Sequence, residues 1–306
     1  MRKITVILLS LTAVNFVVAQ GDIVELKKEL AYARYTLEDT YAYEKTERKF
    51  QWDKISGFLN ALGMLQKDVT SWGIIQNYRN SNGVSPMARN GKKDAYNSIS
   101  DAYGVERVQA IPLYYPADLS VVERYGRDGS LIMIIKDSAD YIKVRMVVYS
   151  GEWMVPRKYV KTVDSIEFKK VICVDRTNQN ICTIEKTDSA WMIRSMNPAT
   201  TGLRRPPYAR ETPKGIFVLQ QKRPKMYYLH DGTSQIAGFA PYANRFCRGA
   251  YIHGVPVNSI HGTLVEYSRT LGTTPRSHMC VRNATSHARF IYDWAPIDGT
   301  LVYVFE

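Results

Sequence analysis

The N-terminal third of the chain carries apolar residues at helical spacing. Between Ile23 and Tyr41 they recur mostly at steps of three or four positions with charged residues between them, and the run from Trp52 to Trp72 repeats the pattern. This spacing places the apolar side chains on one face of an α-helix. We therefore predict a helical region over residues 20–103, with two amphipathic helices and a short third one over 94–102.

The pattern changes to β-strands at about Gly104. Three segments are rich in β-branched and aromatic residues, namely 105–114, 131–135 and 141–148. Such runs are typical of strands, and the polar sequence from Gly126 to Gly129 supplies a turn between two of them. We therefore predict a small β-domain over residues 104–166.

The end of this region resembles the closing segment of an SH3 domain. Gly151 to Lys161 contains Trp, Pro and Tyr, the residues that line the ligand groove of an SH3 domain. The resemblance implies a small SH3-like β-barrel. Trp153 and Tyr159 would then either line a groove or pack the interior of the barrel.

Two short apolar runs after residue 167 predict a β-hairpin. Val171–Asp175 and Asn180–Ile184 flank a polar turn. Cys173 and Cys182 lie at equal distances from that turn, so they should face each other across the two strands. Directly opposed Cβ atoms are close enough for a disulfide, and we expect this pair to be oxidised in an exported protein.

The first residues predict export. A basic start, Met1 to Lys3, precedes an uncharged and mostly apolar run that ends at the small residue Ala19. This is the layout of a secretory signal peptide, so we expect residues 1–19 to be removed. We find no later stretch that is long and apolar enough to span a bilayer.

The formal net charge of +12 favours an acidic partner. Nucleic acid, an anionic membrane surface and the cell wall are the usual candidates for a basic protein. The basic residues are scattered along the chain and no nucleic-acid motif accompanies them, so we do not expect nucleic acid to be the partner.

The candidate chemistry lies around Cys280. His278 precedes this cysteine by two positions, and an apolar segment that ends in His253 and Gly254 lies upstream. A cysteine becomes an effective nucleophile when an imidazole or oriented backbone N–H groups favour its thiolate. A lone cysteine is more often a small buried apolar residue, so the assignment depends on the surrounding residues.

Those surroundings resemble the signature of the L,D-transpeptidase (YkuD) family. Leu271-Gly272 leads into Ser277-His278-Met279-Cys280-Val281-Arg282, which matches the family's Ser-His-Gly-Cys-hydrophobic-Arg, with Met279 in place of the glycine. Further family elements follow one another in the expected order: the hairpin with Asp175 and Gln179, the element Thr212–Phe217, the strand Gly249–Gly254 and the last strand Gly299–Phe305.

The resemblance completes the expected architecture. Residues 167–306 would form a mostly-β L,D-transpeptidase catalytic domain. The chain as a whole would then be a multidomain α+β protein, with a signal peptide (1–19), a helical region (20–103), an SH3-like domain (104–166) and this catalytic domain.

The resemblance also implies acyl transfer to peptidoglycan stem peptides in the periplasm or cell envelope, with no metal or organic cofactor. Cys280 would attack a stem-peptide amide and hold the acyl group as a thioester, and an amine of a neighbouring stem would then form a 3–3 cross-link. His253 would be the general base, and backbone N–H groups around His278, Met279 and Cys280 would form the oxyanion hole. The His278 side chain would orient the thiolate or the substrate. The remaining residues assigned to the loop and to substrate binding are Ser277, Arg282, Tyr251 and Gly254.

Two features of the signature leave alternatives open. Met279 replaces a glycine, so the loop either has ordinary dihedrals or holds Met279 in a strained conformation. His261-Gly262-Thr263 copies the family's His-Gly-Thr more literally than His253 does and lies nearer to Cys280. A strand holds a base more rigidly than a loop, so we favour His253, keep His261 as the alternative base, and interpret Val255–Arg269 as a lid.

Three other functions remain to be weighed. A zinc site would draw on the usual nitrogen and sulfur ligands, although no zincin motif or paired-cysteine spacing accompanies them. Its candidate ligands are His253, His261, His278, Cys280 and His287. The second alternative is a non-catalytic cell-wall-binding protein, and the third is an L,D-carboxypeptidase, in which water resolves the same thioester.

Overall fold

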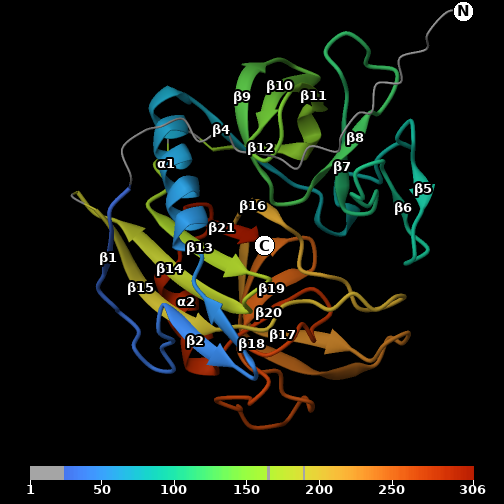
Figure 1. The fold of residues 1–306 in the computed structure, drawn as a ribbon. Coiled ribbons are helices and arrows are strands. Elements are labelled where there is room, and N and C mark those ends of the chain that lie inside the picture. Colours follow the sequence, from blue (N-terminus) through green and yellow to red (C-terminus); the bar gives the residue numbers. More distant parts are fainter. Residues whose placement is uncertain (1–23, 164–165, 189) are drawn as a thin grey trace, which may run out of the picture.

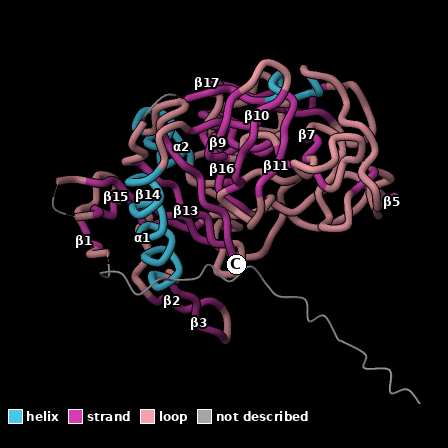
Figure 2. The backbone as a smooth tube through the Cα atoms, turned by 90° about the horizontal axis from the view of Figure 1, so that it is seen from above, coloured by secondary structure: helices cyan, strands magenta, loops and turns pink. Residues whose placement is uncertain are grey.

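Three β-sheets carry most of the fold in the computed structural model (Figure 1). The structure describes residues 24–163, 166–188 and 190–306, and the expected signal peptide lies outside them. In the view of Figure 2, the strands β7, β9, β10 and β11 gather on one side, and helix α1 lies with β13, β14 and β15 on the other. Within the described residues, no helix has both the length and the apolar character needed to cross a membrane.

The largest sheet has six strands in the order β1-β15-β14-β13-β21-β16. Their bounds are β1 (Leu26–Lys28), β15 (Trp191–Pro198), β14 (Asn180–Lys186), β13 (Lys170–Asp175), β21 (Thr300–Phe305) and β16 (Gly215–Val218). The predicted hairpin is β13 and β14, and its register pairs Cys173 with Cys182 as expected. The expected disulfide is wrong, because all four cysteines are free thiols. The two side chains pack in the apolar core instead, each 1% exposed.

A second sheet of four strands, β17-β18-β19-β20, lies against the first. Its strands are β17 (Gln221–Leu229), β18 (Ile236–Cys247), β19 (Ala250–His253) and β20 (Val281–Arg282), and α2 (Thr285–Trp294) packs on β18 and β19. One apolar cluster joins Ile172 of β13, Phe246 of β18 and Ile291 of α2. The two sheets and α2 therefore share a core, and we call residues 166–306 the C-terminal unit.

The third sheet has the order β11-β10-β9-β4-β12 and belongs to residues 70–163, which we call the accessory unit. Its strands are β11 (Glu152–Pro156), β10 (Tyr141–Met146), β9 (Leu131–Asp137), β4 (Trp72–Ile75) and β12 (Val160–Val163). Two small hairpins complete the unit, β5 (Lys92–Lys93) with β6 (Ile99–Ser100) and β7 (Ala110–Leu113) with β8 (Arg124–Arg127).

The predicted SH3-like barrel is wrong, because the described strands of the accessory unit form no closed barrel. Their sheet is open, with β11 and β12 at its edges. Strand β4, from the region predicted to be helical, pairs with both β9 and β12 and so occupies an interior position. Trp153 and Tyr159 are buried in the core of this unit, at 4% and 2% exposure.

The predicted helical N-terminal region is also wrong, because its described residues form only the second of the predicted helices, as α1 (Trp52–Asp68). The predicted α+β class is wrong for the same reason, since the described residues are mostly β. Residues 24–49 are an extended arm that contains β1 and the hairpin of β2 (Thr40–Tyr43) and β3 (Thr46–Lys49). Strand β1 pairs in parallel with β15, and Leu26 and Leu30 pack against the core. The open edge of the large sheet supplies hydrogen-bond partners for the backbone of the arm. This pairing outweighs the preference for a helix that the apolar spacing indicates.

The predicted helix over 94–102 is replaced by the turn between β5 and β6. The Asp94 carboxylate accepts hydrogen bonds from the backbone N–H groups of Tyr96 (2.8 Å) and Ser98 (3.0 Å). An aspartate that caps its own following residues in this way favours a turn over a helix.

A buried ion pair joins the accessory unit to the C-terminal unit. Asp128, in the predicted turn between β8 and β9, is fully buried, and its Oδ2 lies 2.7 Å from Nη1 of Arg245. The same carboxylate accepts the backbone N–H groups of Asn77 (2.8 Å) and Arg248 (2.9 Å). A buried carboxylate with this many donors fixes the two units against each other.

We predict that Asp128→Asn destabilises the protein by about 3–5 kcal/mol, because it leaves the Arg245 guanidinium buried without its counter-ion. Urea unfolding followed by tryptophan fluorescence measures this. The matched control is Asp137→Asn in the same unit, which breaks an exposed ion pair with Arg157 and should cost less than about 1 kcal/mol. Equal losses in the two variants would contradict the role assigned to Asp128.

Candidate active site

The structure brings Cys280 against the start of strand β19. Strands β19 and β20 run in parallel, with Ile252 opposite Val281 and His253 opposite Arg282. Cys280 directly precedes β20 and is half-buried, and its thiol donates to the carbonyl of Gly249, with Sγ and O 3.6 Å apart. The pairing of two strand ends therefore places the thiol beside the residues that lead to His253.

Four of the predicted site residues share one face of this sheet. Alternate residues of a strand lie on the same face, so Tyr251 and His253 of β19 lie together. In the adjacent strand Arg282 is opposite His253, and Cys280 is two positions before Arg282. The register thus gathers a thiol, an imidazole and a guanidinium on one surface.

Burial keeps the Cys280 thiol protonated in the resting protein. It raises the pKa of Cys280, while the backbone N–H of Tyr251 and the positive charge of Arg282 act in the opposite direction. A neutral thiol is a weak nucleophile and needs a base that takes its proton.

His253 has the properties of such a base. It is 3% exposed, and its Nδ1 lies 2.6 Å from the carbonyl oxygen of Gly254. Because a carbonyl only accepts, Nδ1 carries the proton and Nε2 is left as the acceptor. Burial lowers the pKa of His253 to about 4, so the imidazole is neutral at neutral pH and its Nε2 carries no proton.

The competing histidine lies elsewhere. His261 is exposed, and its backbone N–H contacts the Ser259 hydroxyl in a turn of the long loop between β19 and β20. His287 is buried in α2, where its Nε2 lies 2.9 Å from the Ser195 hydroxyl. Of these three histidines, His253 is the one that the sheet register aligns with β20.

The signature loop before Cys280 is clamped to residues 201–212. The backbone N–H groups of Arg276 and Ser277 both donate to the carbonyl of Thr201, at 2.9 and 3.1 Å, and Ser277 is 1% exposed. The Ser277 hydroxyl donates to the Cys280 carbonyl. Gln179 supports the clamp from the β13–β14 hairpin, because its side chain bonds both the hydroxyl and the N–H of Thr201.

Met279 occupies a backbone conformation that favours glycine, with φ at 118°. Of the two alternatives that the sequence left open, the strained one therefore holds. The Thr212 hydroxyl donates to the Met279 carbonyl (2.8 Å) and accepts the N–H of Gly202 (2.8 Å), which locks the peptide in place. A side chain in such a region costs about 1–3 kcal/mol and persists only where its surroundings impose it.

We predict that Met279→Gly is more stable than Met279→Ala by about 1 kcal/mol, the reverse of the usual order. Both variants lose the packing of the methionine side chain against the core, but only glycine relieves the positive φ. Thermal and urea unfolding of the two variants side by side provide the measurement. An alanine variant at least as stable as the glycine variant would show that the loop is not strained at this position.

The remaining predicted residues have partners that the sequence did not indicate. His278 is exposed, and its Nε2 lies 3.1 Å from the carboxylate of Asp231 in the turn between β17 and β18. The Tyr251 hydroxyl is 3.4 Å from that of Tyr78 in the accessory unit. A Cβ on Gly254 would lie 2.8 Å from the Thr285 hydroxyl, so this glycine lets the end of β19 approach α2.

Arg282 is the one cation on the shared face of β19 and β20. Burial lowers the pKa of its guanidinium, and its Nε atom is buried without a hydrogen-bond partner in the described part of the chain. A desolvated guanidinium with a free donor favours an anion, either the Cys280 thiolate or a carboxylate.

The loop between β19 and β20, residues 254–280, contains the predicted lid. Val257 pairs with Phe239 of β18, and the Tyr228 hydroxyl donates to the Val257 carbonyl (3.0 Å). Further along, the Thr285 hydroxyl donates to the Val265 carbonyl (2.6 Å). The loop is therefore anchored at several points rather than free.

The described residues contain no group of three or more His, Cys, Asp and Glu side chains placed to hold a metal ion. The candidate zinc ligands have other surroundings: Cys280 bonds Gly249, His278 pairs with Asp231, and His287 bonds Ser195.

We predict that iodoacetamide modifies Cys280 first under native conditions. Cys280 is half-exposed, whereas the other three cysteines are at most 1% exposed. The labelling rate should rise with pH, because burial raises the pKa of this thiol and only the thiolate reacts. Intact mass spectrometry should show one adduct, absent from Cys280→Ala, and four after unfolding without reductant; two after unfolding would indicate a disulfide instead.

A comparison with protein families finds a match within the C-terminal unit. The model of the YkuD family, described as the L,D-transpeptidase catalytic domain, matches residues 169–304. This range contains both strands of the site, the signature loop and all of the last strand, β21, except Phe305. No curated protein matches the chain.

Solved structures give more distant similarities. An amidase/peptidase/peptidoglycan-binding protein from Clostridium acetobutylicum is 23% identical, with a TM-score of 0.33, over 45% of this chain and 52% of that one. An L,D-transpeptidase from Mycobacterium smegmatis is 16% identical, with a TM-score of 0.36, over 57% and 82%. L,D-transpeptidase 3 from Mycobacterium tuberculosis, in complex with a faropenem-derived adduct, is 15% identical, with a TM-score of 0.37, over 59% and 93%. The chain spans about half the length of the first of these structures, and the identification depends on the family match.

Proposed function

We propose that this protein is a peptidoglycan L,D-transpeptidase that acts through a cysteine thioester, since residues 169–304 belong to the YkuD family of L,D-transpeptidase catalytic domains. One observation carries the proposal. The half-buried thiol of Cys280 lies beside strand β19, which holds a buried neutral imidazole on the same face.

The first half-reaction forms the thioester. Nε2 of His253 takes the thiol proton, which requires the Cys280 side chain to turn away from Gly249. The thiolate attacks the amide carbonyl that precedes the terminal residue of a tetrapeptide stem, and the C–N bond breaks as the imidazolium returns the proton to the leaving amine. We assign the oxyanion to the backbone N–H groups of Met279 and Cys280, and each such donor contributes about 3–4 kcal/mol.

The second half-reaction resolves the thioester. The side-chain amine of a neighbouring stem attacks the thioester carbonyl and His253 takes the amine proton. The C–S bond then breaks, and the imidazolium returns the proton to the sulfur, which regenerates the thiol and the neutral imidazole. The product is a 3–3 cross-link. No ATP is needed, because the amide that breaks is replaced by the amide that forms. This chemistry places the protein at the cell wall, and we infer that it is exported.

We predict that His253→Ala lowers the rate at which a carbapenem acylates Cys280 at least about 100-fold, because the thiol loses its base. His261→Ala, in the exposed loop, should change the rate less than about threefold. Time-resolved intact mass spectrometry follows the adduct, and Cys280→Ala is the blank. If His261→Ala abolishes acylation and His253→Ala does not, the assignment of the base is wrong.

The products formed from a disaccharide-tetrapeptide show whether an amine or water accepts the acyl group of the thioester. A cross-linked dimer is the expected product, and mass spectrometry distinguishes it from the tripeptide that hydrolysis releases. Exclusive formation of tripeptide would make the protein an L,D-carboxypeptidase. No turnover together with no thioester on Cys280 would contradict the proposed reaction itself.

A further inference from the structure

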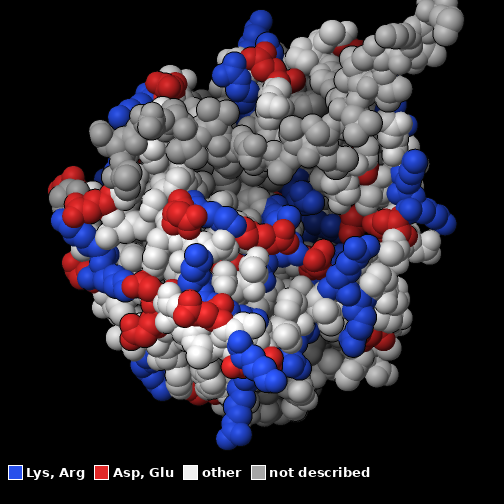
Figure 3. All heavy atoms as spheres, in the orientation of Figure 1, with Lys and Arg blue, Asp and Glu red and all other residues white. Residues whose placement is uncertain are grey.

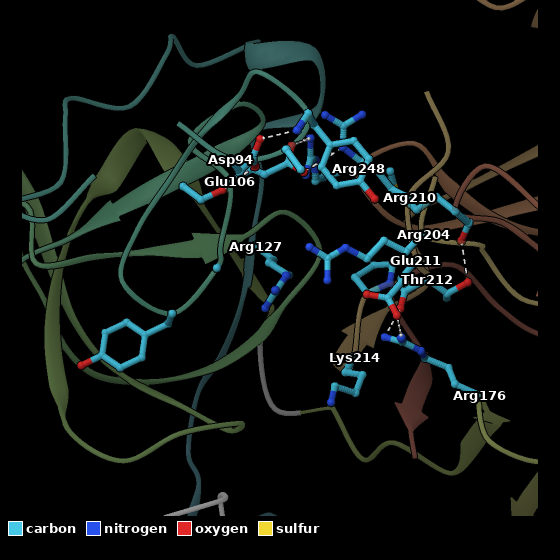
Figure 4. Close-up of a pocket in the computed structure, with 17 residues that line it drawn as sticks. Asp94, Glu106, Arg127, Arg176, Arg204, Arg210, Glu211, Thr212, Lys214 and Arg248 are labelled. Atoms are coloured by element: carbon cyan, nitrogen blue, oxygen red, sulfur yellow. Dashed lines mark hydrogen bonds and ion pairs between the residues drawn. The ribbon is translucent and has the colours of Figure 1, made fainter. Parts of the chain in front are cut away.

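A basic pocket of about 550 Å³ lies between the accessory unit and the C-terminal unit (Figure 4). Its volume falls in the range of small-ligand sites. Its charged lining consists of six cations, Arg127, Arg176, Arg204, Arg210, Lys214 and Arg248, and three acids, Asp94, Glu106 and Glu211. The lining therefore carries an excess of three positive charges (six minus three). In Figure 3, basic atoms are visible in a hollow near the middle of the molecular face.

The three acids of the pocket already have partners. Glu106 pairs with both Arg210 (2.7 Å) and Arg248 (2.9 Å). Glu211 pairs with Arg176 (2.6 Å), and Asp94 accepts the hydroxyl of Ser100 and two backbone N–H groups. Of these three acids only Asp94 has neutral donors alone, and even with its charge counted the lining keeps its excess of three positive charges.

Two of those cations, Arg127 and Arg204, have no carboxylate partner among the described residues. Arg127 belongs to the accessory unit and Arg204 to the C-terminal unit, and Figure 4 shows both side chains reaching into the pocket from opposite walls. Two guanidinium groups that face one hollow repel each other unless an anion lies between them. Their forked donors match the two oxygens of a carboxylate.

The pocket begins one residue away from the thiol. Arg248 and Met279 both line it. The residues that follow them, Gly249 and Cys280, carry the carbonyl and the thiol that lie 3.6 Å apart. Cys280 itself does not line the pocket, so a peptide bound there must extend past Arg248 and Met279 to reach Sγ.

We propose that this pocket binds a free carboxylate of a peptidoglycan stem peptide beside Cys280, with Arg127 and Arg204 as its cationic anchors. The inference rests on the proposed function, which makes a stem peptide the substrate. Tyr96 and Tyr103 also line the pocket and offer apolar surface to the rest of a peptide. The accessory unit then forms one wall of the substrate site through Arg127.

Binding to full-length Cys280→Ala protein tests the proposal without turnover. A tetrapeptide stem with free carboxylates is titrated by calorimetry at low salt. Arg204→Gln and Arg127→Gln should each weaken binding roughly tenfold, the size expected for a lost charge-assisted contact. The matched control is Arg205→Gln, the neighbour of Arg204, which is exposed and does not line the pocket and should leave the Kd within about twofold.

A second peptide identifies the group that is recognised. The same stem with its carboxylates converted to carboxamides should bind roughly tenfold more weakly to Cys280→Ala, and Arg204→Gln should not weaken it further. Equal Kd values for the two peptides, or equal effects of Arg204→Gln and Arg205→Gln, would overturn the proposal.

The binding and thioester experiments test the pocket proposal and the proposed reaction independently. If the parent protein forms a thioester on Cys280 but Arg204→Gln binds normally, the reaction stands and the pocket proposal fails. If no thioester forms but tetrapeptide binding still depends on Arg204 and on free carboxylates, the pocket stands and the proposed reaction fails.

Discussion

The buried carboxylate of Asp128 is the constraint on which the arrangement of the two units depends. It binds the Arg245 guanidinium and two backbone N–H groups, one from each unit. The next residue, Gly129, adopts φ 83°, and a Cβ there would lie 1.9 Å from the Phe246 carbonyl oxygen. Its own carbonyl accepts the N–H of Val218 (2.9 Å). A single turn therefore inserts a charge and a close backbone approach into the C-terminal unit, and both require the two units to keep this geometry.

That docking also organises the basic pocket. Arg127 directly precedes Asp128, and the backbone N–H of Arg248 is one of the donors to Asp128. Both arginines line the pocket. The same turn that attaches the accessory unit thus sets the position of a cation from each wall, and it fixes the chain one residue before Gly249, which contacts the thiol. The contacts that attach the accessory unit therefore also determine the shape of the pocket.

Single local elements were easier to predict from sequence than the arrangement that joins them. The β13–β14 hairpin, the helix α1 and the strand that ends at His253 follow from local patterns, because turns, apolar spacing and β-formers act over a few residues. The prediction of a helix for the N-terminal arm failed because its apolar residues have helical spacing and also fit an open sheet edge. The arm is extended because the free edge at β15 is available to pair with it. The prediction of an SH3-like barrel failed because β4, an interior strand of the sheet, comes from outside the segment whose sequence is β-rich. Nothing in the sequence indicated the roles of Asp128 and Asp231, since their partners, Arg245 and His278, lie 117 and 47 positions away.

The N-terminal arm gains a purpose once its extended course is known. From β1 it runs along β15 to the loop between β19 and β20, where the Tyr35 ring lies 4.5 Å from that of Tyr267. The Tyr32 hydroxyl lies 2.7 Å from that of Ser286, and Ser286 in turn bonds Glu266 of the same loop.

These contacts give the loop a further anchor besides β17, β18 and α2, and the arm itself is held by backbone pairing with the large sheet. A loop of this length loses considerable entropy when it is ordered. The arm offsets part of that loss, because it adds contacts that are present before any substrate binds. The segment whose spacing predicts a helix therefore supports the loop between β19 and β20.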